Sequence, residues 1–403
     1  MSKTEIPSIR FHGFDDAWEQ RKLGDLVKEV ARRDPNSNAP IMMITANNGF
    51  IEQSERYAFN NAGESLKKYI LLQKGELAYN HGASKLRPYG SCFALTTAEN
   101  ARIPFVYHCF SAERMNPEFL SIELNGNEIE SQLRSIVSSG ARMDGLLNIS
   151  FGEYTSVSIL FPKKNEQDKI ADFFRQLDNL ITLHQRKFEK LTNVKKSMLE
   201  KMFPRNGSCY PEIRFKGFTD PWEQRKFEDA FIERREKTVT ENEDTLLSCA
   251  INGMFLNSEL FGHFRGTTTI GYLKVKKNDL ILSAQNLHLG NANVNLRFEH
   301  GIISPAYKVY DLNNCEPEFV QAWVKKEDTK NFFLAATTEG ASQCRKNIEW
   351  DTLGKQTICM PAIKEQATIG SFFKCVDNLI TLHQHELEKL QSIKKALLEK
   401  MFV

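Results

Sequence analysis

The sequence has few cysteines, and none of the eight lies in a CxxC pair or at the His and Cys spacing of a zinc site. This scatter argues against a disulfide framework or a metal motif, and it favours reduced thiols in the core of a cytosolic protein. No apolar run approaches the length of a membrane span, and the N-terminal residues lack the apolar stretch of a signal peptide. We therefore expect a soluble, cytoplasmic protein.

An excess of positive charge is also missing, because 53 lysines and arginines nearly balance 51 aspartates and glutamates, for a net charge of +2. Any binding of nucleic acid must therefore depend on local patches and not on the charge of the whole chain.

Sequence motifs for catalysis are absent as well. No glycine-rich loop for S-adenosylmethionine follows a predicted strand, no GxxxxGK[ST] phosphate loop occurs, and no set of paired carboxylates with a lysine suggests a nuclease. The segment Asn116–Phe119 superficially resembles the (Asn/Asp)-Pro-Pro-(Tyr/Phe) loop of amino-methyltransferases. Its third residue is Glu, however, and a helix that starts at Pro117 explains it better. We infer that chemistry is done elsewhere, and we expect no cofactor and no metal in this chain.

What the sequence does contain is a duplicated stretch. Residues Glu166–Phe203 return as Glu365–Phe402, and 24 of the 42 residues between Pro162 and Phe203 match their partners 199 positions later. The first copy contains no glycine and no proline, so it predicts an uninterrupted helix of about 38 residues, roughly 55 Å long.

Apolar residues recur in heptads through both copies, which is typical of a helix that packs along a seam. In the first copy Ile170, Leu177, Leu191 and Met198 form one row, and Phe173, Leu180 and Val194 join it. One small domain cannot cover so long a helix, so we expect the two copies to pack on each other. The residues predicted in the core of this helix pair are Leu177, Ile181, His184, Leu191, Val376, Ile380, His383 and Leu390.

The stretch that precedes each long helix begins with a second duplication. Residues Pro7–Asp25 return as Pro211–Asp229, 204 positions later, and landmarks between the repeats persist at offsets that fall to 200. Small insertions and deletions in the loops of one common scaffold explain this drift. We place lobe one at 1–161, its helix at 162–204, lobe two at 205–360 and the last helix at 361–403.

Each lobe has a mixed pattern of short apolar runs and a proline-initiated helix, which predicts an α+β fold. Helices are expected to begin at Pro117 and Pro317, and Trp18 and Trp222 are expected in the scaffold core. The runs predicted as strands are Tyr69–Tyr79, Ile103–Phe110, Ser156–Phe161, Asp279–Ser283, Ala306–Tyr310 and Gln356–Met360.

The order lobe, long helix, lobe, long helix, with matching helices and diverged lobes, resembles the specificity subunit of type I restriction-modification systems. The resemblance covers the whole chain, and it is carried by the two WEQRK starts at Trp18 and Trp222 and by the two EQ…DNLITLHQ…KK..LEKMF helices. It implies two target-recognition domains, each of which reads one half of a split sequence in double-stranded DNA. It also implies that the two helices pack antiparallel, related by a pseudo-twofold axis, and hold the lobes apart.

The resemblance further implies partners that carry the catalysis. Two methyltransferase subunits and two restriction subunits are expected on this scaffold, with S-adenosylmethionine, ATP and Mg²⁺ bound in those partners. This chain would then be a DNA-recognition subunit and not an enzyme.

His184 and His383 occupy matching positions near the middle of the two long helices. A polar residue in such a seam sets the register of the helices at some cost in stability. An antiparallel pair would bring the two midpoints together, so we expect these two rings to lie close to each other. A metal site would need third and fourth ligands that the sequence does not place nearby.

DNA contacts are predicted in polar, basic loops of each lobe, where amides and imidazoles would meet base edges and cations would meet phosphates. In lobe one the predicted residues are Tyr79, Asn80, His81, Ser84, Lys85, Arg87, Tyr89, Gly140 and Arg142. In lobe two they are Ser283, Gln285, Asn286, His288, Asn291, Asn293, Ser342, Gln343, Arg345 and Lys346. For any single residue, a solvated surface loop explains the pattern equally well.

Two other functions remain open at this point. A stand-alone sequence-specific DNA-binding regulator would have the same two lobes and would bind its site without a methyltransferase. An enzyme that uses His184 or His383 would show activity as an isolated chain. The lysine pairs Lys195–Lys196 and Lys394–Lys395 fit a solvated face, a contact with the DNA backbone or a contact with a partner subunit. The DNA sequence recognised and the length of the gap between its halves cannot be read from these residues.

Overall fold

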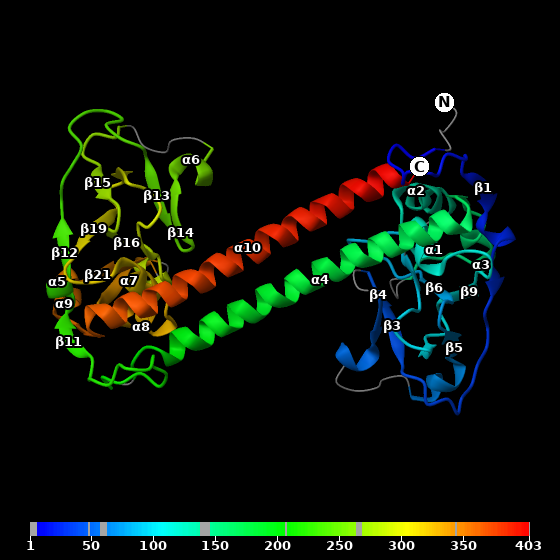
Figure 1. Cartoon of the computed structure of the whole chain (residues 1–403), viewed down its shortest axis with the longest axis horizontal. Helices are drawn as coiled ribbons and strands as arrows, with labels where there is room; N and C mark the ends of the chain where they lie inside the picture. Colours follow the sequence, from blue (N-terminus) through cyan, green and yellow to red (C-terminus); the bar gives the residue numbers. More distant parts are fainter. Residues whose placement is uncertain are drawn as a thin grey trace. The chain divides into compact units, whose positions relative to one another are not determined.

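The computed structural model describes residues 6–46, 49–56, 63–137, 146–205, 208–262, 268–342 and 345–402. The chain forms two compact units: unit 1 is Met1–Leu183 with Leu387–Val403, and unit 2 is His184–Glu386. Each unit contains one lobe of mixed helices and strands together with part of each long helix, α4 (Lys164–Lys201) and α10 (Ile363–Met401) (Figure 1). The boundary drawn from sequence between each lobe and its helix remains a prediction.

Unit 1 contains ten strands, three α-helices of its own and part of each long helix among its described residues. The strands are β1 (Glu19–Lys22), β2 (Lys28–Glu29), β3 (Met42–Thr45), β4 (Gly49–Glu52), β5 (Ile70–Gln73), β6 (Leu77–Asn80), β7 (Ser91–Ala94), β8 (Asn100–Ile103), β9 (His108–Ser111) and β10 (Ser158–Phe161). The helices are α1 (Pro117–Leu124), α2 (Asn127–Ile136), α3 (Phe151–Tyr154) and the first half of α4 (Lys164–Lys201), with 3-10 turns η1 (Leu23–Asp25), η2 (Gln53–Glu55) and η3 (Gly63–Lys68).

Unit 2 repeats this order with local differences. Its strands are β11 (Glu223–Lys226), β12 (Phe231–Arg234), β13 (Leu247–Ala250), β14 (Gly253–Leu256), β15 (Leu273–Lys276), β16 (Leu280–Ser283), β17 (Ala292–Val294), β18 (His300–Ile303), β19 (Tyr307–Leu312), β20 (Thr337–Ser342), β21 (Arg345–Ile348) and β22 (Thr357–Met360). Its helices are α5 (Phe227–Ala230), α6 (Asn257–Leu260), α7 (Pro317–Val324), α8 (Glu327–Leu334), α9 (Trp350–Lys355) and the first half of α10 (Ile363–Met401), with the 3-10 turn η4 (Leu287–Leu289).

The two lobes share one sheet topology. A four-stranded antiparallel sheet has the order β2-β9-β6-β7 in unit 1 and β12-β19-β16-β17 in unit 2. Around it lie matching two-stranded pairs, β3-β4 with β13-β14, β5-β8 with β15-β18, and β1-β10 with β11-β22. The α+β fold with an internal repeat, which the sequence predicted, is therefore confirmed.

Two of the predicted strands are each divided by a turn. Tyr69–Tyr79 contains β5, a turn at Gly75 with φ +85°, and β6. Ile103–Phe110 contains the end of β8, a turn in which the Tyr107 N–H donates to the Pro104 carbonyl, and the start of β9. The helices that start at Pro117 and Pro317 are present as predicted, because proline needs no N–H partner in the first turn.

The start of each long helix is fastened to its own lobe by the same contacts. In unit 1 the Arg10 guanidinium donates to both carboxylate oxygens of Glu166, at 2.6 and 2.7 Å, and in unit 2 Arg214 does the same to Glu365 at 2.6 and 2.7 Å. Both carboxylates are only 1% exposed. A buried pair of this kind costs about 3–5 kcal/mol when one partner is removed, so each lobe is firmly oriented on its helix start.

The end of each long helix is buried in the lobe of the same unit. In unit 2 Phe203, just after α4, contacts Trp222 and Phe319 at ring-centroid distances of 5.9 and 5.3 Å. In unit 1 Phe402, just after α10, contacts Trp18 and Phe119 at 6.0 and 5.7 Å. Both tryptophans are 2% exposed, which confirms their predicted place in the core.

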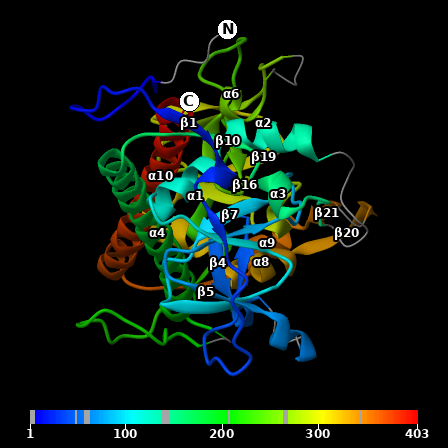
Figure 2. The same cartoon turned by 90° about the vertical axis from the view of Figure 1, so that its right-hand side faces the viewer.

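Backbone hydrogen bonds complete these joints. The Ile213 N–H donates to the Lys201 carbonyl at 2.9 Å in unit 2, and the Ile9 N–H donates to the Lys400 carbonyl at 3.0 Å in unit 1. The end of α10 accordingly lies beside the N-terminal segment in Figure 2. In each unit one helix therefore starts where the other ends, so the two run antiparallel there.

Gly370 permits a close approach between α10 and α7. A Cβ at this position would lie 2.7 Å from the Phe319 backbone nitrogen, which is closer than real Cβ contacts. The glycine therefore reflects tight packing of α10 on its lobe, although glycine inside a helix costs about 1 kcal/mol relative to alanine. Among the helices of the described chain, none is both long enough and apolar enough to cross a membrane.

Candidate nucleic-acid interface

Two of the residues predicted to contact DNA in lobe one are buried. Tyr79 at the end of β6 is 1% exposed, its ring stacks on Tyr154 at a centroid distance of 3.8 Å, and its hydroxyl donates to the Tyr89 carbonyl at 2.6 Å. His81 is 8% exposed, and its ring nitrogens lie 2.8 and 2.7 Å from the carbonyl oxygens of Leu147 and Val106. Both side chains are held inside the lobe in this structure, which argues against their predicted contact with base edges.

Asn80 has a scaffold role as well. Its amide donates to the Ile44 carbonyl at 3.2 Å, and its carbonyl oxygen accepts from the Gly82 N–H at 3.0 Å. These contacts hold the hairpin β3-β4 against the central sheet, and they occupy both ends of the amide.

The turn that follows keeps an exposed cation at its tip. Ser84 and Arg87 close the turn through backbone and hydroxyl contacts of 3.0 Å, and the Arg87 guanidinium donates to the Asn125 carbonyl at 2.7 Å. Lys85 is exposed between them, and Tyr89 is half-buried. Lys85 is therefore the predicted contact that this loop presents most freely to a partner.

Lobe two repeats this outcome. Ser283, Asn291 and Asn293 are 5%, 6% and 0% exposed, which argues against the predicted DNA contacts at these three positions. The Asn291 amide donates to the Cys249 carbonyl at 3.1 Å, and the Asn293 amide donates to the Ala250 carbonyl at 2.7 Å. The two asparagines thereby fasten the hairpin β13-β14 to the central sheet.

The loop after β16 retains three polar residues at the surface. Gln285 and Asn286 are exposed, and His288 is half-buried in η4. These three side chains remain candidates for contact with DNA. The predicted residues Gly140, Arg142 and Gln343 lie outside the described residues, and only the backbone is described for Ser342, Arg345 and Lys346, in the hairpin β20-β21.

The residues predicted in the core of the helix pair are all buried or half-buried. In unit 1 Leu177 is 7% exposed, and Ile181 and Leu390 pack against the same core cluster. In unit 2 Val376 is 7% exposed, and Leu191 and Ile380 are half-buried.

Leu180 is an exception among the residues of the heptad rows. It is 46% exposed, so its predicted place in the seam is wrong. The rows through Leu177 and Ile181 already fill the contact, and Leu180 lies beyond its edge.

Ion pairs join the two long helices within each unit. Lys394 Nζ lies 2.5 Å from Asp178 in unit 1, and Lys195 Nζ lies 2.5 Å from Asp377 in unit 2. One lysine of each pair therefore helps to fix the register of α4 against α10. The sequence carries a signal for these contacts, because both aspartates belong to the identical segment DNLITLHQ, although neither was among the predicted residues.

His184 and His383 meet in unit 2. Their Nδ1 atoms are 3.2 Å apart and their ring centroids 5.1 Å apart, as expected for the midpoints of an antiparallel pair. One ring donates and the other accepts, so this contact requires at least one neutral imidazole. No group of three or more His, Cys, Asp or Glu side chains in the described part of the chain is placed to hold a metal ion.

Acid is expected to weaken this contact. Partial burial, the neighbouring His184 and the charge of Lys187 lower the pKa of His383 from its ordinary 6.5. A histidine with a lowered folded-state pKa contributes stability that is present above about pH 6.5 and is lost as pH falls through the folded-state value. The melting temperature of unit 2 should therefore fall between about pH 7 and pH 5, and His383→Gln should reduce that fall. An equal fall in both proteins would contradict this role.

Unit 1 contains a groove of about 690 Å³ between α1, the start of α2 and the two long helices. Glu123 of α1 is one of the residues that line this groove. Its carboxyl group is buried, and burial raises its pKa to about 8 in spite of a hydrogen bond from the Leu160 N–H. The equivalent position in α7 is Trp323, which packs among the phenylalanines of unit 2. The groove therefore differs chemically from the matching region of the other lobe.

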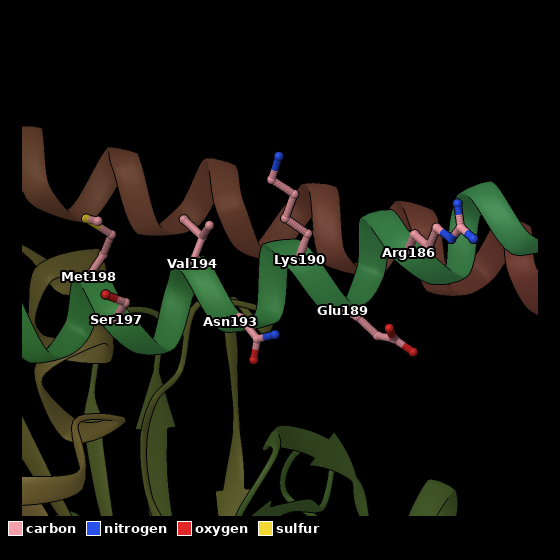
Figure 3. A pocket seen from close by; sticks show the side chains of 7 residues that line it. All are labelled: Arg186, Glu189, Lys190, Asn193, Val194, Ser197 and Met198. Atoms are coloured by element: carbon pink, nitrogen blue, oxygen red, sulfur yellow. The ribbon is translucent and has the colours of Figure 1, made fainter. Parts of the chain in front are cut away.

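A second hollow, of about 500 Å³, lies on α4 in unit 2. All the residues that line it come from this one helix, and in Figure 3 Val194 and Met198 point toward α10 while Glu189 and Asn193 point away. Without a second wall this hollow cannot enclose a small ligand.

Comparison by sequence finds similarity to a curated protein of known class. The specificity subunit of the type I restriction enzyme HindI from Haemophilus influenzae is 25% identical over 195 residues, which are 46% of this chain and 40% of that protein. The match thus spans less than half of the relative's own length. No family model matches the chain.

Solved structures extend the likeness to the whole chain. The S subunit of a type I restriction-modification system from M. genitalium has a TM-score of 0.59 at 13% identity, over 99% of each chain. The HsdS subunit from Thermoanaerobacter tengcongensis covers 96% of each chain at 14% identity, with a TM-score of 0.42. The likeness to the M. genitalium S subunit shows that the chain has the fold of a type I restriction-modification specificity subunit, and its sequence resembles one over about half of its length.

Proposed function

We propose that this chain is the DNA-recognition subunit of a type I restriction-modification complex. Each lobe would bind one half of a split target in double-stranded DNA, and the chain itself would carry no catalysis. The observation that supports this most strongly is the contrast between the repeats. The Arg10–Glu166 and Arg214–Glu365 joints are the same, whereas the surface loops that hold Lys85 in one lobe and Gln285 in the other are different. Two lobes that are fixed to their helices by the same contacts but have different surface loops suit the recognition of two different DNA sequences.

DNA would be held mainly through its phosphates, with Lys85 among the contacts in lobe one and the Gln285–His288 loop near the bases in lobe two. Affinity should accordingly fall with rising salt, because bound phosphates release counterions.

The long helices support a scaffolding role. Four leucines, Leu180 and Leu183 in unit 1 and Leu379 and Leu382 in unit 2, are 40–52% exposed. They belong to the DNLITLHQ segments at 178–185 and 377–384, which are identical in the two copies. Packing within the chain does not require exposed leucines. A partner that binds twice, such as a pair of methyltransferase subunits, would require the same surface on both helices.

Charged substitutions at these leucines test this scaffold. With Leu180→Asp and Leu183→Asp, we expect the chain to co-purify with one methyltransferase subunit instead of two, and with all four leucines changed it should bind none. Native mass spectrometry of the co-expressed complex counts the subunits. Leu86→Asp is the control, because Leu86 is 65% exposed in lobe one and lies far along the chain from the helices.

Retention of two methyltransferase subunits by the fourfold variant would exclude these leucines as the docking surface. A wild-type chain that binds its DNA site tightly and co-purifies with no methyltransferase would favour the stand-alone regulator. In the same proposal, restriction subunits would join the complete complex, and ATP and Mg²⁺ would bind in the partner subunits.

A further inference from the structure

Two cysteines that are 150 positions apart in the sequence lie together at the base of lobe two. Cys209 is in the connector that follows α4, and Cys359 is on β22, the strand that leads into α10. Their sulfur atoms are 3.8 Å apart, and both residues are half-buried.

The backbone holds both cysteines in place. The Trp222 N–H donates to the Cys209 carbonyl at 2.9 Å, and Cys359 is paired with Gln224 in the β11-β22 ladder. The Gln224 amide also lies 3.7 Å from the Cys209 sulfur. The nearness of the two sulfurs therefore follows from ordered structure on both sides.

Other cysteines of the described chain have different surroundings. Cys92, Cys109, Cys249 and Cys315 are buried, and Cys375 is exposed on α10. The position in lobe one that matches Cys359 is Leu160, which is 6% exposed in the core. The thiol pair is therefore a feature of lobe two alone, and it is not part of the scaffold that the lobes share.

We propose that Cys209 and Cys359 form a redox-responsive pair that closes to a disulfide when a peroxide is present. In the first step the Cys209 sulfur attacks hydrogen peroxide, the O–O bond breaks, and a sulfenic acid and water are formed. In the second step the Cys359 sulfur attacks the Cys209 sulfur, the S–O bond breaks, and the hydroxide leaves as water with the remaining thiol proton. Overall, two thiols and one hydrogen peroxide give one disulfide and two waters.

Burial and the neighbouring Cys209 thiol raise the pKa of Cys359, which disfavours Cys359 as the thiol that reacts first with peroxide. Closure would join the connector that leaves α4 to the strand that enters α10. Lys326 already donates to the Pro204 carbonyl in this connector at 3.1 Å. The disulfide would therefore fix the end of α4 and the start of α10 to the base of lobe two. This inference does not depend on what the lobe binds.

The test uses the full chain with Cys375→Ser, which removes the exposed thiol. After treatment with hydrogen peroxide and alkylation of the remaining thiols, mass spectrometry of a non-reduced digest should find the Cys209 and Cys359 peptides linked. A reductant should separate them. The melting temperature of unit 2 should rise by about 5 °C on oxidation, because the cross-link closes a long loop.

Cys209→Ser and Cys359→Ser should each abolish both the linked peptide and the rise in melting temperature. The wild-type chain, treated in parallel, shows that the peroxide dose is sufficient when its exposed Cys375 becomes oxidised. The proposal is overturned if, at that dose, Cys209 and Cys359 both remain free to alkylate, or if either of them links to a different cysteine.

Discussion

Glu123→Gln is expected to stabilise unit 1 by roughly 3–5 kcal/mol near pH 8.5 and to change little near pH 4. Burial raises the pKa of the Glu123 carboxyl to about 8 in the folded chain, from an ordinary value of 4.5. A raised folded-state pKa means that stability is fully present below about pH 4.5 and is lost as pH rises through about 8. Glutamine matches the shape of the neutral acid and does not ionise, so it removes this loss.

Hydrogen exchange of the buried amides of α1 at several pH values measures the effect in the intact chain. Glu99→Gln is the matched control, because the Glu99 side chain is 82% exposed in the same lobe. If the protection of α1 falls with pH to the same extent in wild type and in Glu123→Gln, the buried carboxyl is not the cause.

Phe203→Ala is expected to destabilise unit 2 by about 3–5 kcal/mol, the usual cost of removing a buried phenylalanine. Phe203 is 2% exposed and contacts Trp222, Phe319 and Phe373, so alanine would leave a cavity where the end of α4 meets the lobe. The helix root would then be free to move within the unit, and the lobe would lose its fixed orientation on α4.

Chemical unfolding followed by tryptophan fluorescence reports on this joint, because Trp222 contacts Phe203. Leu180→Ala is the control on the same helix, and we expect it to change stability by less than about 0.5 kcal/mol because the side chain is 46% exposed. A larger loss of unfolding free energy from Leu180→Ala than from Phe203→Ala would contradict the buried position of Phe203 and the exposed position of Leu180.

The long helices were predictable because their signal is spread over many residues. Residues 162–204 and 361–403 were expected, and the helices span Lys164–Lys201 and Ile363–Met401. The position of single residues in the seam was harder to predict. A helix of 3.6 residues per turn drifts by about 20° per heptad from a strict seven-residue repeat. A row such as that of Leu180 therefore rotates out of the contact.

The surface of the lobes could be predicted only in part. His81, Asn291 and Asn293 have the side chains that read bases, and the same groups also satisfy buried carbonyl groups of neighbouring hairpins. Sequence does not distinguish these two uses, because the carbonyl partners come from segments distant in the chain. The joints were missed for a different reason: Arg10 and Glu166 are repeated as Arg214 and Glu365, but nothing local pairs them.

The central claim is that this chain reads a split DNA target, one half with each lobe. Its most direct test is to sequence the methylated bases in cells that express this chain with its methyltransferase partner. Our account predicts one motif made of two unlike short sequences separated by a gap of constant length, and it predicts that exchange of lobe two changes one half only. A continuous motif, or methylation that is the same without this chain, would contradict it.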